Sequence, residues 1–280
     1  MFNILTFDIE DWYHAKLVHR SVSEWQNYKD RVVEPTLKIL KLLSRTNNKA
    51  TFFVLGYVAE MFPELVQKIT NEGHEVASHS YGHQLIYNLN EKKFTEDLKR
   101  SKNIIEDILG EQILGYRAPS WSFNESTAWV WNILYENGFR YDSSLFPFKV
   151  FLYGSNSHPR FLHQKEIEQG KVIFEIPPSV IERFGKRIPC SGGFYFRTLP
   201  YWFIRFALNC INKKEHQPAV VYLHPWEIDL DQPRFTIGLR NRFIQYHNLN
   251  KTEIKLKHLL NEFKFTSIKD YLLNKGLLTF

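Results

Sequence analysis

The chain has 280 residues, of which 44% are hydrophobic and 16% aromatic, so it can bury a sizeable core and wholesale disorder is excluded. Its only two cysteines, Cys190 and Cys210, exclude a disulfide framework and a zinc–thiolate site. The formal net charge is +6, and no basic run of five or more residues occurs, which argues against a nucleic-acid partner.

Short apolar segments alternate with amphipathic ones along the chain, which is typical of α/β proteins. We predict strands at residues 2–7, 50–55, 74–78, 115–119, 139–142, 172–176 and 219–223. Helices are predicted at residues 33–44, 63–72, 95–109, 126–136, 199–212 and 251–263. Polar residues cluster just after the predicted strands, where parallel α/β folds build their sites, so the layout favours a (β/α) barrel over an open sheet.

We expect residues 1–280 to form a single domain, with an irregular insertion at about 148–197 and a C-terminal helical extension at about 251–280. The N-terminus lacks a basic segment followed by an apolar run, so we expect no secretory signal and a cytoplasmic protein. No stretch of 18 uncharged apolar residues predicts a spanning helix. The segment 199–211, with Trp202 and Phe206 around Arg205, is either a helix packed on the sheet or a helix that contacts the inner membrane surface.

Three acidic residues, Asp8, Glu10 and Asp11, follow the first predicted strand. Side chains two residues apart on an extended segment point to the same face, so Asp8 and Glu10 can converge. Two facing carboxylates repel each other unless a cation or a proton lies between them. The alternative is a helix N-terminus, where acidic side chains complement the helix dipole.

Two histidines, His79 and His83, follow the strand predicted at 74–78. At a spacing of four they meet on one side of a helical turn and can share a metal, although a solvated pair is an alternative. Two imidazoles and one carboxylate make a three-ligand site with open positions, as in catalytic metal centres.

Three more polar residues follow other predicted strands. Arg117 can pair with a carboxylate or lie on the surface beside Pro119, and Asp142 is either a site residue or an ordinary turn residue. His224, before Pro225, is a candidate general acid or a structural histidine.

Taken in order, the segments TFDIED, HSYGH, RAPSW, YDSS and LHPWE resemble the polysaccharide deacetylase family, also called carbohydrate esterase family 4 or the NodB homology domain, over residues 2–229. TFDIEDW, HPWEID and SGGFYFR together resemble a bacterial branch found with exopolysaccharide and surface-glycan synthesis.

This resemblance implies a deformed (β/α)7 barrel with a divalent metal, most often zinc. The implied activity is removal of N-acetyl groups from amino sugars of a polysaccharide or a lipid-linked glycan intermediate. Asp8 would be the general base, paired with Arg117, and His224 the general acid, oriented by Asp142.

The resemblance further implies that His79 and His83 bind the metal. Most family members have a second acid directly after the base, but this chain has Ile9 there. The same-face argument therefore favours Glu10 as the acidic ligand, with Asp11 in reserve. A backbone N–H near Ser120 would bind the oxyanion, and two tryptophans would stack on sugar rings or pack at the barrel mouth. These tryptophans are Trp121 and Trp226.

Other functions remain open alternatives. The resembled fold family also includes enzymes that hydrolyse small cyclic amides and ureides. A barrel without activity would only bind glycan. A scaffold subunit of a glycan-synthesis complex would use the helix at 251–263 for contact. The remaining histidines, including His14, are interpreted as surface or packing residues.

Overall fold

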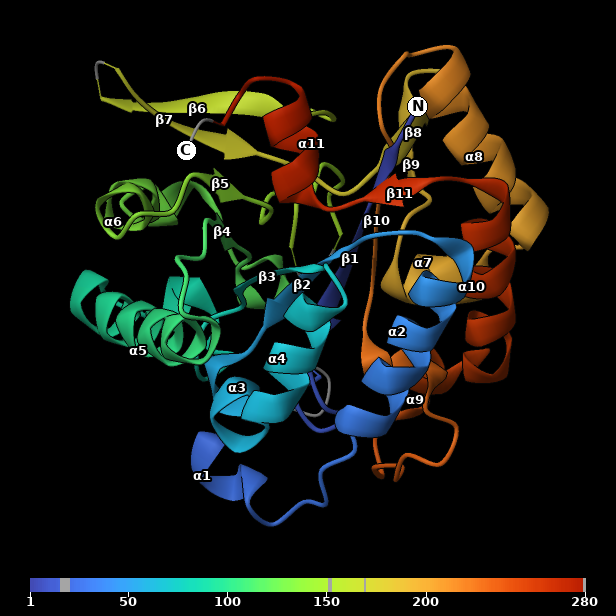
Figure 1. Cartoon of the computed structure of the whole chain (residues 1–280). Helices are drawn as coiled ribbons and strands as arrows, with labels where there is room; N and C mark the ends of the chain where they lie inside the picture. The colour runs from blue at the N-terminus through green and yellow to red at the C-terminus, as the bar shows by residue number, and fades with distance from the viewer. Residues whose placement is uncertain (16–20, 151–152, 169, 279–280) are drawn as a thin grey trace.

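The computed structural model describes residues 1–15, 21–150, 153–168 and 170–278. Within them, seven parallel strands form one curved sheet in the order β10-β1-β2-β3-β4-β5-β7 (Figure 1). Their bounds are β1 Asn3–Ile9, β2 Thr51–Val54, β3 Glu75–Ser78, β4 Gly115–Tyr116, β5 Tyr141–Asp142, β7 Lys171–Glu175 and β10 Val220–Leu223. Each of these strands overlaps a strand predicted from the sequence.

Four further strands lie outside the parallel series. β6 (His163–Glu168) pairs antiparallel with β7, and β11 (Phe265–Thr266) pairs parallel with the start of β1. β8 (Val180–Arg183) and β9 (Lys186–Pro189) form a separate hairpin. The segment predicted to be an irregular insertion therefore contains two hairpins and supplies β7 to the main sheet.

The seam between the outermost parallel strands, β7 and β10, is closed without a continuous ladder. The Ser179 N–H, shortly after β7, donates to the Val220 carbonyl at 3.0 Å, and the Val220 N–H donates to Ser179 Oγ at 2.8 Å. Seven parallel strands with one incomplete seam confirm the predicted deformed (β/α)7 barrel.

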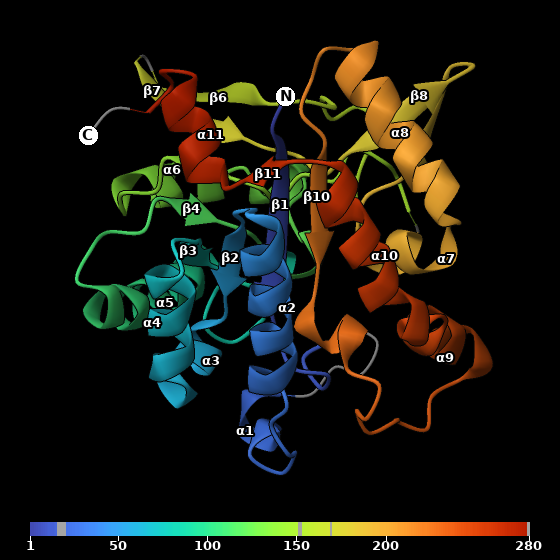
Figure 2. The ribbon, with the colours of Figure 1, turned by 45° about the vertical axis from the view of Figure 1, so that its right-hand side comes forward.

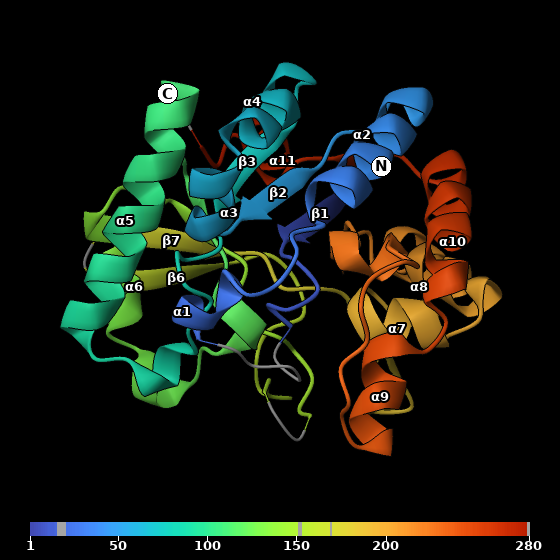
Figure 3. The ribbon, with the colours of Figure 1, turned by 90° about the horizontal axis from the view of Figure 1, so that it is seen from below.

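Helices surround the sheet, as the view from below shows (Figure 3). Each predicted helix is found with shifted ends, except that the segment 126–136 divides into a 3-10 turn at Glu125–Thr127 and a shorter α6. The bounds are α1 Val22–Trp25, α2 Val33–Thr46, α3 Gly56–Met61, α4 Pro63–Asn71, α5 Glu91–Leu109, α6 Val130–Glu136, α7 Gly193–Thr198, α8 Tyr201–Lys213, α9 Leu239–Tyr246, α10 Leu249–Glu262 and α11 Ile268–Asn274. None of the helices in the described ranges is both long and apolar enough to traverse a lipid bilayer.

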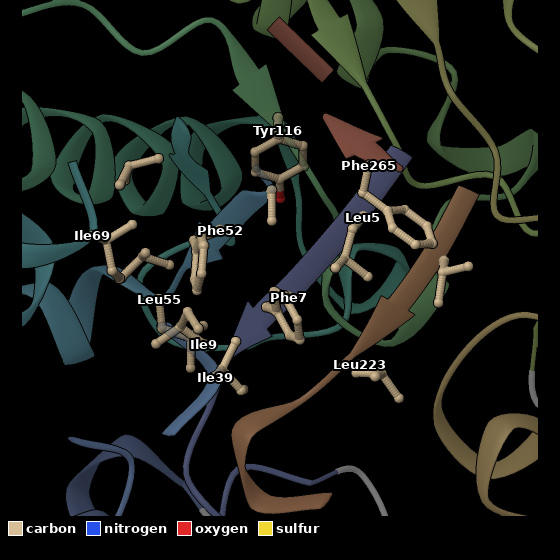
Figure 4. Close-up of a cluster of buried hydrophobic side chains, with 14 of the residues drawn as sticks. Leu5, Phe7, Ile9, Ile39, Phe52, Leu55, Ile69, Tyr116, Leu223 and Phe265 are labelled. Atoms are coloured by element: carbon tan, nitrogen blue, oxygen red, sulfur yellow. The ribbon is translucent and has the colours of Figure 1, made fainter. Parts of the chain in front are cut away.

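Alternation along β1 places its side chains in two different environments. Leu5, Phe7 and Ile9 face the surrounding helices and pack in the main core with Phe52 and Ile39 (Figure 4). The alternate residues face the barrel interior, where Ile4 packs with Phe53 and with Ile268 and Leu272 of α11. Because a strand has a side-chain period of two, Thr6, Asp8 and Glu10 continue the interior row.

Candidate active site

The polar residues singled out from the sequence lie where the parallel strands end. Asp8 is the residue before the last in β1, His79 follows β3 directly, and Arg117 follows β4. His224 follows β10, and it lines the same cavity as Asp8. This cavity has a volume of about 610 Å³.

Glu10 and the two histidines form a tight cluster. Glu10 Oε1 lies 3.0 Å from Nε2 of His79 and 3.0 Å from Nε2 of His83, and all three side chains are buried. Burial alone would raise the pKa of Glu10, but His83, His79 and His224 outweigh burial and hold that pKa well below its usual range.

The tautomer of His79 is fixed by the backbone. Its Nδ1 lies 2.8 Å from the Arg117 carbonyl oxygen, which can only accept, so Nδ1–H is the donor. In the neutral imidazole, the lone pair of Nε2 then faces the Glu10 carboxylate. Such facing acceptors need a shared proton or cation, so the cluster fits a divalent metal held by Glu10, His79 and His83.

The spacing of the two histidines predicts a helical turn, but they do not lie on one. They belong to a loop in which Ser80 and His83 have left-handed backbone angles, with φ of 66° and 49°. The Asp97 carboxylate holds this loop by accepting the N–H groups of Tyr81 at 2.8 Å and Gly82 at 3.0 Å. The two imidazoles therefore do converge, but through a loop and not through a helical turn.

The reserve ligand, Asp11, points elsewhere. Its carboxylate accepts the backbone N–H groups of Trp12 at 2.8 Å, Arg31 at 2.6 Å and Val32 at 2.9 Å. Three backbone donors around one buried carboxylate fix the loop before α2, so the geometry favours Glu10 in the cluster.

Asp8 is held by a fully buried arginine. Arg117 Nη1 donates to Asp8 Oδ1 at 2.5 Å and to Thr6 Oγ1 at 2.9 Å. Its remaining donors bind the carbonyl and the hydroxyl of Ser143 at 3.0 and 2.8 Å, and its guanidinium lies over the Phe53 ring. With every direction of the guanidinium fixed, the Asp8 carboxylate has one orientation, with Oδ2 turned 3.8 Å from His224 Nε2.

The acidic partner of His224 is Glu227, three residues later in the chain. His224 Nδ1 lies 3.5 Å from Glu227 Oε2, an ion-pair distance rather than a good hydrogen bond, and the imidazole ring stacks on Trp226. Burial would lower the pKa of His224, but Glu227, Glu10 and Asp8 raise it to about 9. The protonated imidazole is therefore favoured at neutral pH.

Glu227 is itself anchored by Arg197, a residue of α7. Arg197 Nε donates to Glu227 Oε1 at 2.9 Å, and both side chains are buried. The other guanidinium nitrogens donate to the carbonyls of Ile244, Gln245 and His247, at the end of α9. Burial raises the pKa of Glu227, but His224 and Arg197 outweigh it and lower that pKa below its usual value.

The expectation that Asp142 orients His224 is wrong. Asp142 lies directly opposite Glu175 of β7, and its carboxylate accepts the Ser144 N–H at 2.9 Å and the Ser144 hydroxyl at 2.6 Å. Burial, partly offset by these hydrogen bonds, raises its pKa to about 6. β5 is separated from β10 by β7 on one side and by three strands and β1 on the other, so its end turns toward Glu175.

The predicted substrate contacts all line the cavity. Ser120 and Trp121 have left-handed backbone angles, with φ of 53° and 56°, in a 3-10 turn after β4. Trp121 packs edge-on against Tyr222, and Trp226 lies along His224, so both rings are mostly buried wall residues. Direct stacking of either tryptophan on a sugar remains a prediction.

Several functional residues were not found from the sequence. Glu227 and Arg197 lie in the segments LHPWE and SGGFYFR, but the sequence predicts no role for either. The spacing of three between His224 and Glu227 is the only local signal of the pair. Part of the cavity wall also comes from outside the predicted site segments, namely Val150, Tyr153, Phe194, Tyr195, Phe243 and Ile244. His14, interpreted as a surface or packing residue, is buried, accepts the Asp11 N–H at Nδ1 and packs on Trp25.

One glycine lets the α7 wall approach the barrel. Gly192 has a φ of 99°, and a Cβ there would lie 2.3 Å from the Tyr222 ring. Only glycine allows this approach, which brings Arg197 over Glu227.

The strands form a deformed (β/α)7 barrel, and the carboxylate–bis-histidine cluster lies where these strands end. The family described as polysaccharide deacetylase matches residues 5–141, and a second family, described as a domain of unknown function (DUF3473), matches residues 143–273. Through residues 5–141, the chain belongs to the polysaccharide deacetylase family.

Curated relatives match less than half of the chain. The chain is 35% identical over 108 residues to a peptidoglycan deacetylase of Helicobacter pylori, covering 39% of this chain and 36% of the relative. It is 40% identical over 78 residues to a peptidoglycan-N-acetylglucosamine deacetylase of Bacillus cereus, covering 28% of each. The match thus spans about a third of the length of these relatives.

Solved structures resemble nearly the whole chain. A putative polysaccharide deacetylase from Mycobacterium smegmatis has a TM-score of 0.64 at 20% identity, covering 98% of this chain and 91% of that one. The Puue allantoinase has a TM-score of 0.62 at 15% identity, covering 99% and 91%. At these identities the likeness shows the shared fold.

Proposed function

We propose that this protein is a metal-dependent hydrolase that removes N-acetyl groups from amino sugars in a glycan. The observation that supports it is one cavity joining a carboxylate–bis-histidine cluster, the Asp8–Arg117 pair and the His224–Glu227 pair. These are the groups that metal-assisted amide hydrolysis requires. Membership in the polysaccharide deacetylase family supports the reaction type.

Glu10, His79 and His83 would hold the divalent cation, which we propose to be zinc because one carboxylate and two imidazoles suit that ion. When bound there, such an ion polarises the acetyl carbonyl and lowers the pKa of a water molecule.

Asp8 is the proposed general base. Its Oδ1 is fixed by Arg117, while Oδ2 lies toward the cavity, close enough to the Glu10 cluster to accept a proton from the attacking water. Arg117 orients Asp8 and does not itself reach the cavity lining.

His224 is the proposed general acid, and it lines the same cavity as Asp8. The 3.8 Å between its Nε2 and Asp8 Oδ2 leaves each group able to exchange a proton with substrate rather than with the other. Glu227 stabilises the imidazolium and Arg197 keeps Glu227 in place, so the proton is held on His224 until the sugar amine departs.

For the substrate, we propose an N-acetylated polysaccharide or a lipid-linked glycan intermediate of exopolysaccharide synthesis. Seven Phe, Tyr and Trp side chains line the cavity, and aromatic rings suit the apolar faces of sugars. The named deacetylase relatives act on peptidoglycan according to their names, which supports an N-acetylhexosamine unit. A cytoplasmic location stays a prediction.

Release of acetate from a panel of N-acetylated glycans tests this proposal, with a ureide such as allantoin as a second substrate class. We expect acetate release that a chelator abolishes and added metal restores, and that the Asp8→Asn variant lacks. Ureide cleavage without acetate release would favour the cyclic-amide alternative. Tight glycan binding with no turnover of either class would favour an inactive glycan-binding barrel.

A further inference from the structure

The tip of the β8–β9 hairpin contains an aromatic residue in an unfavourable setting. Phe184 and Gly185 form the two-residue turn, with φ of 52° and 69°. Turns with two left-handed residues prefer Asn-Gly, because Asn tolerates this conformation and bulky side chains do not. Phe184 is moreover completely exposed, with a relative accessibility of 101%. No packing within the described residues offsets this choice.

The flanking charges are unfavourable as well. Arg183 and Lys186 are directly opposite each other across the hairpin, and like charges at such positions repel. Across the described part of the chain, neither cation has a carboxylate within ion-pair distance. Glu182, the nearest acid in sequence, lies 3.8 Å from Arg187 instead.

Helix α8 continues this surface. The Arg183 guanidinium lies 5.5 Å from the centre of the Phe206 ring, and Trp202, one turn earlier, is 68% exposed. Arg205, between them, pairs with Glu262 at 2.9 Å. Figure 2 shows the β8 hairpin beside α8, on the side of the molecule away from α3 and α4. We call the surface made by Arg183, Phe184, Lys186, Trp202 and Phe206 the hairpin face.

We propose that the hairpin face docks on an anionic lipid bilayer, with Phe184 and Trp202 entering the interface and Arg183 and Lys186 binding lipid phosphates. Each unfavourable local choice becomes favourable there, because the bilayer removes the rings from water and supplies negative charge between the cations. Positions where a sequence breaks local rules without internal compensation are expected to be functional.

A second copy of this chain fits the face less well. In a twofold dimer the same patch meets itself, so Arg183 and Lys186 would face another pair of identical cations. An anionic bilayer supplies many anions and an apolar layer, so it matches both the cations and the exposed rings of the hairpin face. The sequence had left open a membrane contact for residues 199–211, and the hairpin tip gives that contact its most exposed aromatic residue.

The face is connected to the proposed active site only through the chain, because none of its five residues lines the cavity. Residues 190–192 lead from β9 into α7, whose Phe194 and Tyr195 line the cavity, and α7 leads into α8 and Trp202. The docking itself does not depend on the proposed function.

Co-sedimentation of the full chain with vesicles tests the proposal. Anionic vesicles of phosphatidylglycerol and phosphatidylethanolamine should bind the protein, and neutral phosphatidylcholine vesicles should not. The Phe184→Asn variant should bind the anionic vesicles about tenfold more weakly. Its Tm should stay equal or rise, since Asn suits the turn. A merely structural role for Phe184 would instead lower the Tm.

Charge variants and a matched control complete the test. Arg183→Gln and Lys186→Gln should each weaken binding about fivefold and reduce its salt sensitivity. Met61→Gln, which removes a 50% exposed side chain at the end of α3, should bind like the wild type. The Asp8→Asn variant should also bind fully, so failure of docking and failure of the proposed activity give different results.

Two outcomes would overturn the docking proposal. One is vesicle binding unchanged in Phe184→Asn and in both charge variants. The other is no vesicle binding together with concentration-dependent self-association, measured by light scattering, that Phe184→Asn abolishes. That second result would assign the face to a contact between copies of this chain.

Discussion

The two sides of the candidate site are built in different ways. On the metal side, Asp8, Glu10 and His79 lie in or directly after β1 and β3, the two strands that flank β2, and their positions follow from strand alternation and strand order. On the acid side, His224 depends on Glu227 and on Arg197, which reaches it from α7 and also ties down the end of α9. Local pattern specifies the first side, whereas long-range packing specifies the second.

The largest effect should come from the base at the centre of both sides. Asp8→Asn should lower kcat about 1,000-fold, because the variant cannot accept the proton from water. Steady-state acetate release measures this loss, and circular dichroism should show the same fold. Asp231→Asn, an exposed acid beyond the site, serves as the control and should retain activity. Near wild-type turnover in Asp8→Asn would assign the base elsewhere.

The adjacent acids Glu10 and Asp11 allow a test of which carboxylate binds the metal and which one only supports the loop before α2. Glu10→Gln should weaken metal binding by more than about 100-fold, because it removes a charged ligand. Asp11→Asn should keep the metal but lower the Tm, since the carboxylate that accepts three backbone N–H groups is altered. Metal content by mass spectrometry, with thermal melts, distinguishes the two; the reverse pattern would make Asp11 the ligand.

The acid side makes a prediction about pH. The Glu227 carboxylate helps to raise the pKa of His224 to about 9, so Glu227→Gln should lower that pKa. Because His224 must be protonated to act, activity would then be lost at a lower pH as pH rises, and the basic limb of kcat/KM should move down by at least about one pH unit.

Asp142→Asn provides the comparison for that profile. Its carboxylate contacts Ser144 and faces Glu175, so the basic limb should stay in place. A shift in Asp142→Asn but not in Glu227→Gln would restore Asp142 as the orienting residue.

The smallest effect concerns the buried acids beside the site. Burial raises the pKa values of both Asp142 and Glu175, so the folded chain keeps protons that the unfolded chain releases above about pH 4. These two groups should therefore lower the free energy of unfolding as pH rises from about 4 to 7. Glu175→Gln should flatten this dependence by about 1 kcal/mol, measured by urea unfolding at the two ends of that range.

Much of the fold and of the metal side could be predicted from the sequence. The apolar β-rich segments identified the seven parallel strands, and a period of two placed Asp8 and Glu10 on one face. Local pattern failed where distant residues decide the conformation. The loop of His79 and His83 takes its shape from Asp97 of α5, and the partner of His224 could be chosen only once the position of β5 in the sheet was known.

The hairpins show a second reason for failure. β6 and β8 carry several charged and exposed residues, so they lack the continuous apolar run that marked the central strands. Edge strands and isolated hairpins are stabilised by few buried side chains, and their sequences resemble loops.

The pairing of β11 with β1 has a consequence for synthesis of the chain. Asn3 donates its backbone N–H to Lys264 at 2.8 Å, and Ile268 and Leu272 of α11 cover Ile4 and Phe53 at the amino-terminal end of the barrel. A ribosome makes these partners some 260 residues apart, so the floor of the barrel stays open to water until nearly all of the chain has emerged. During that interval, chaperones would meet the aromatic interior that α11 later seals.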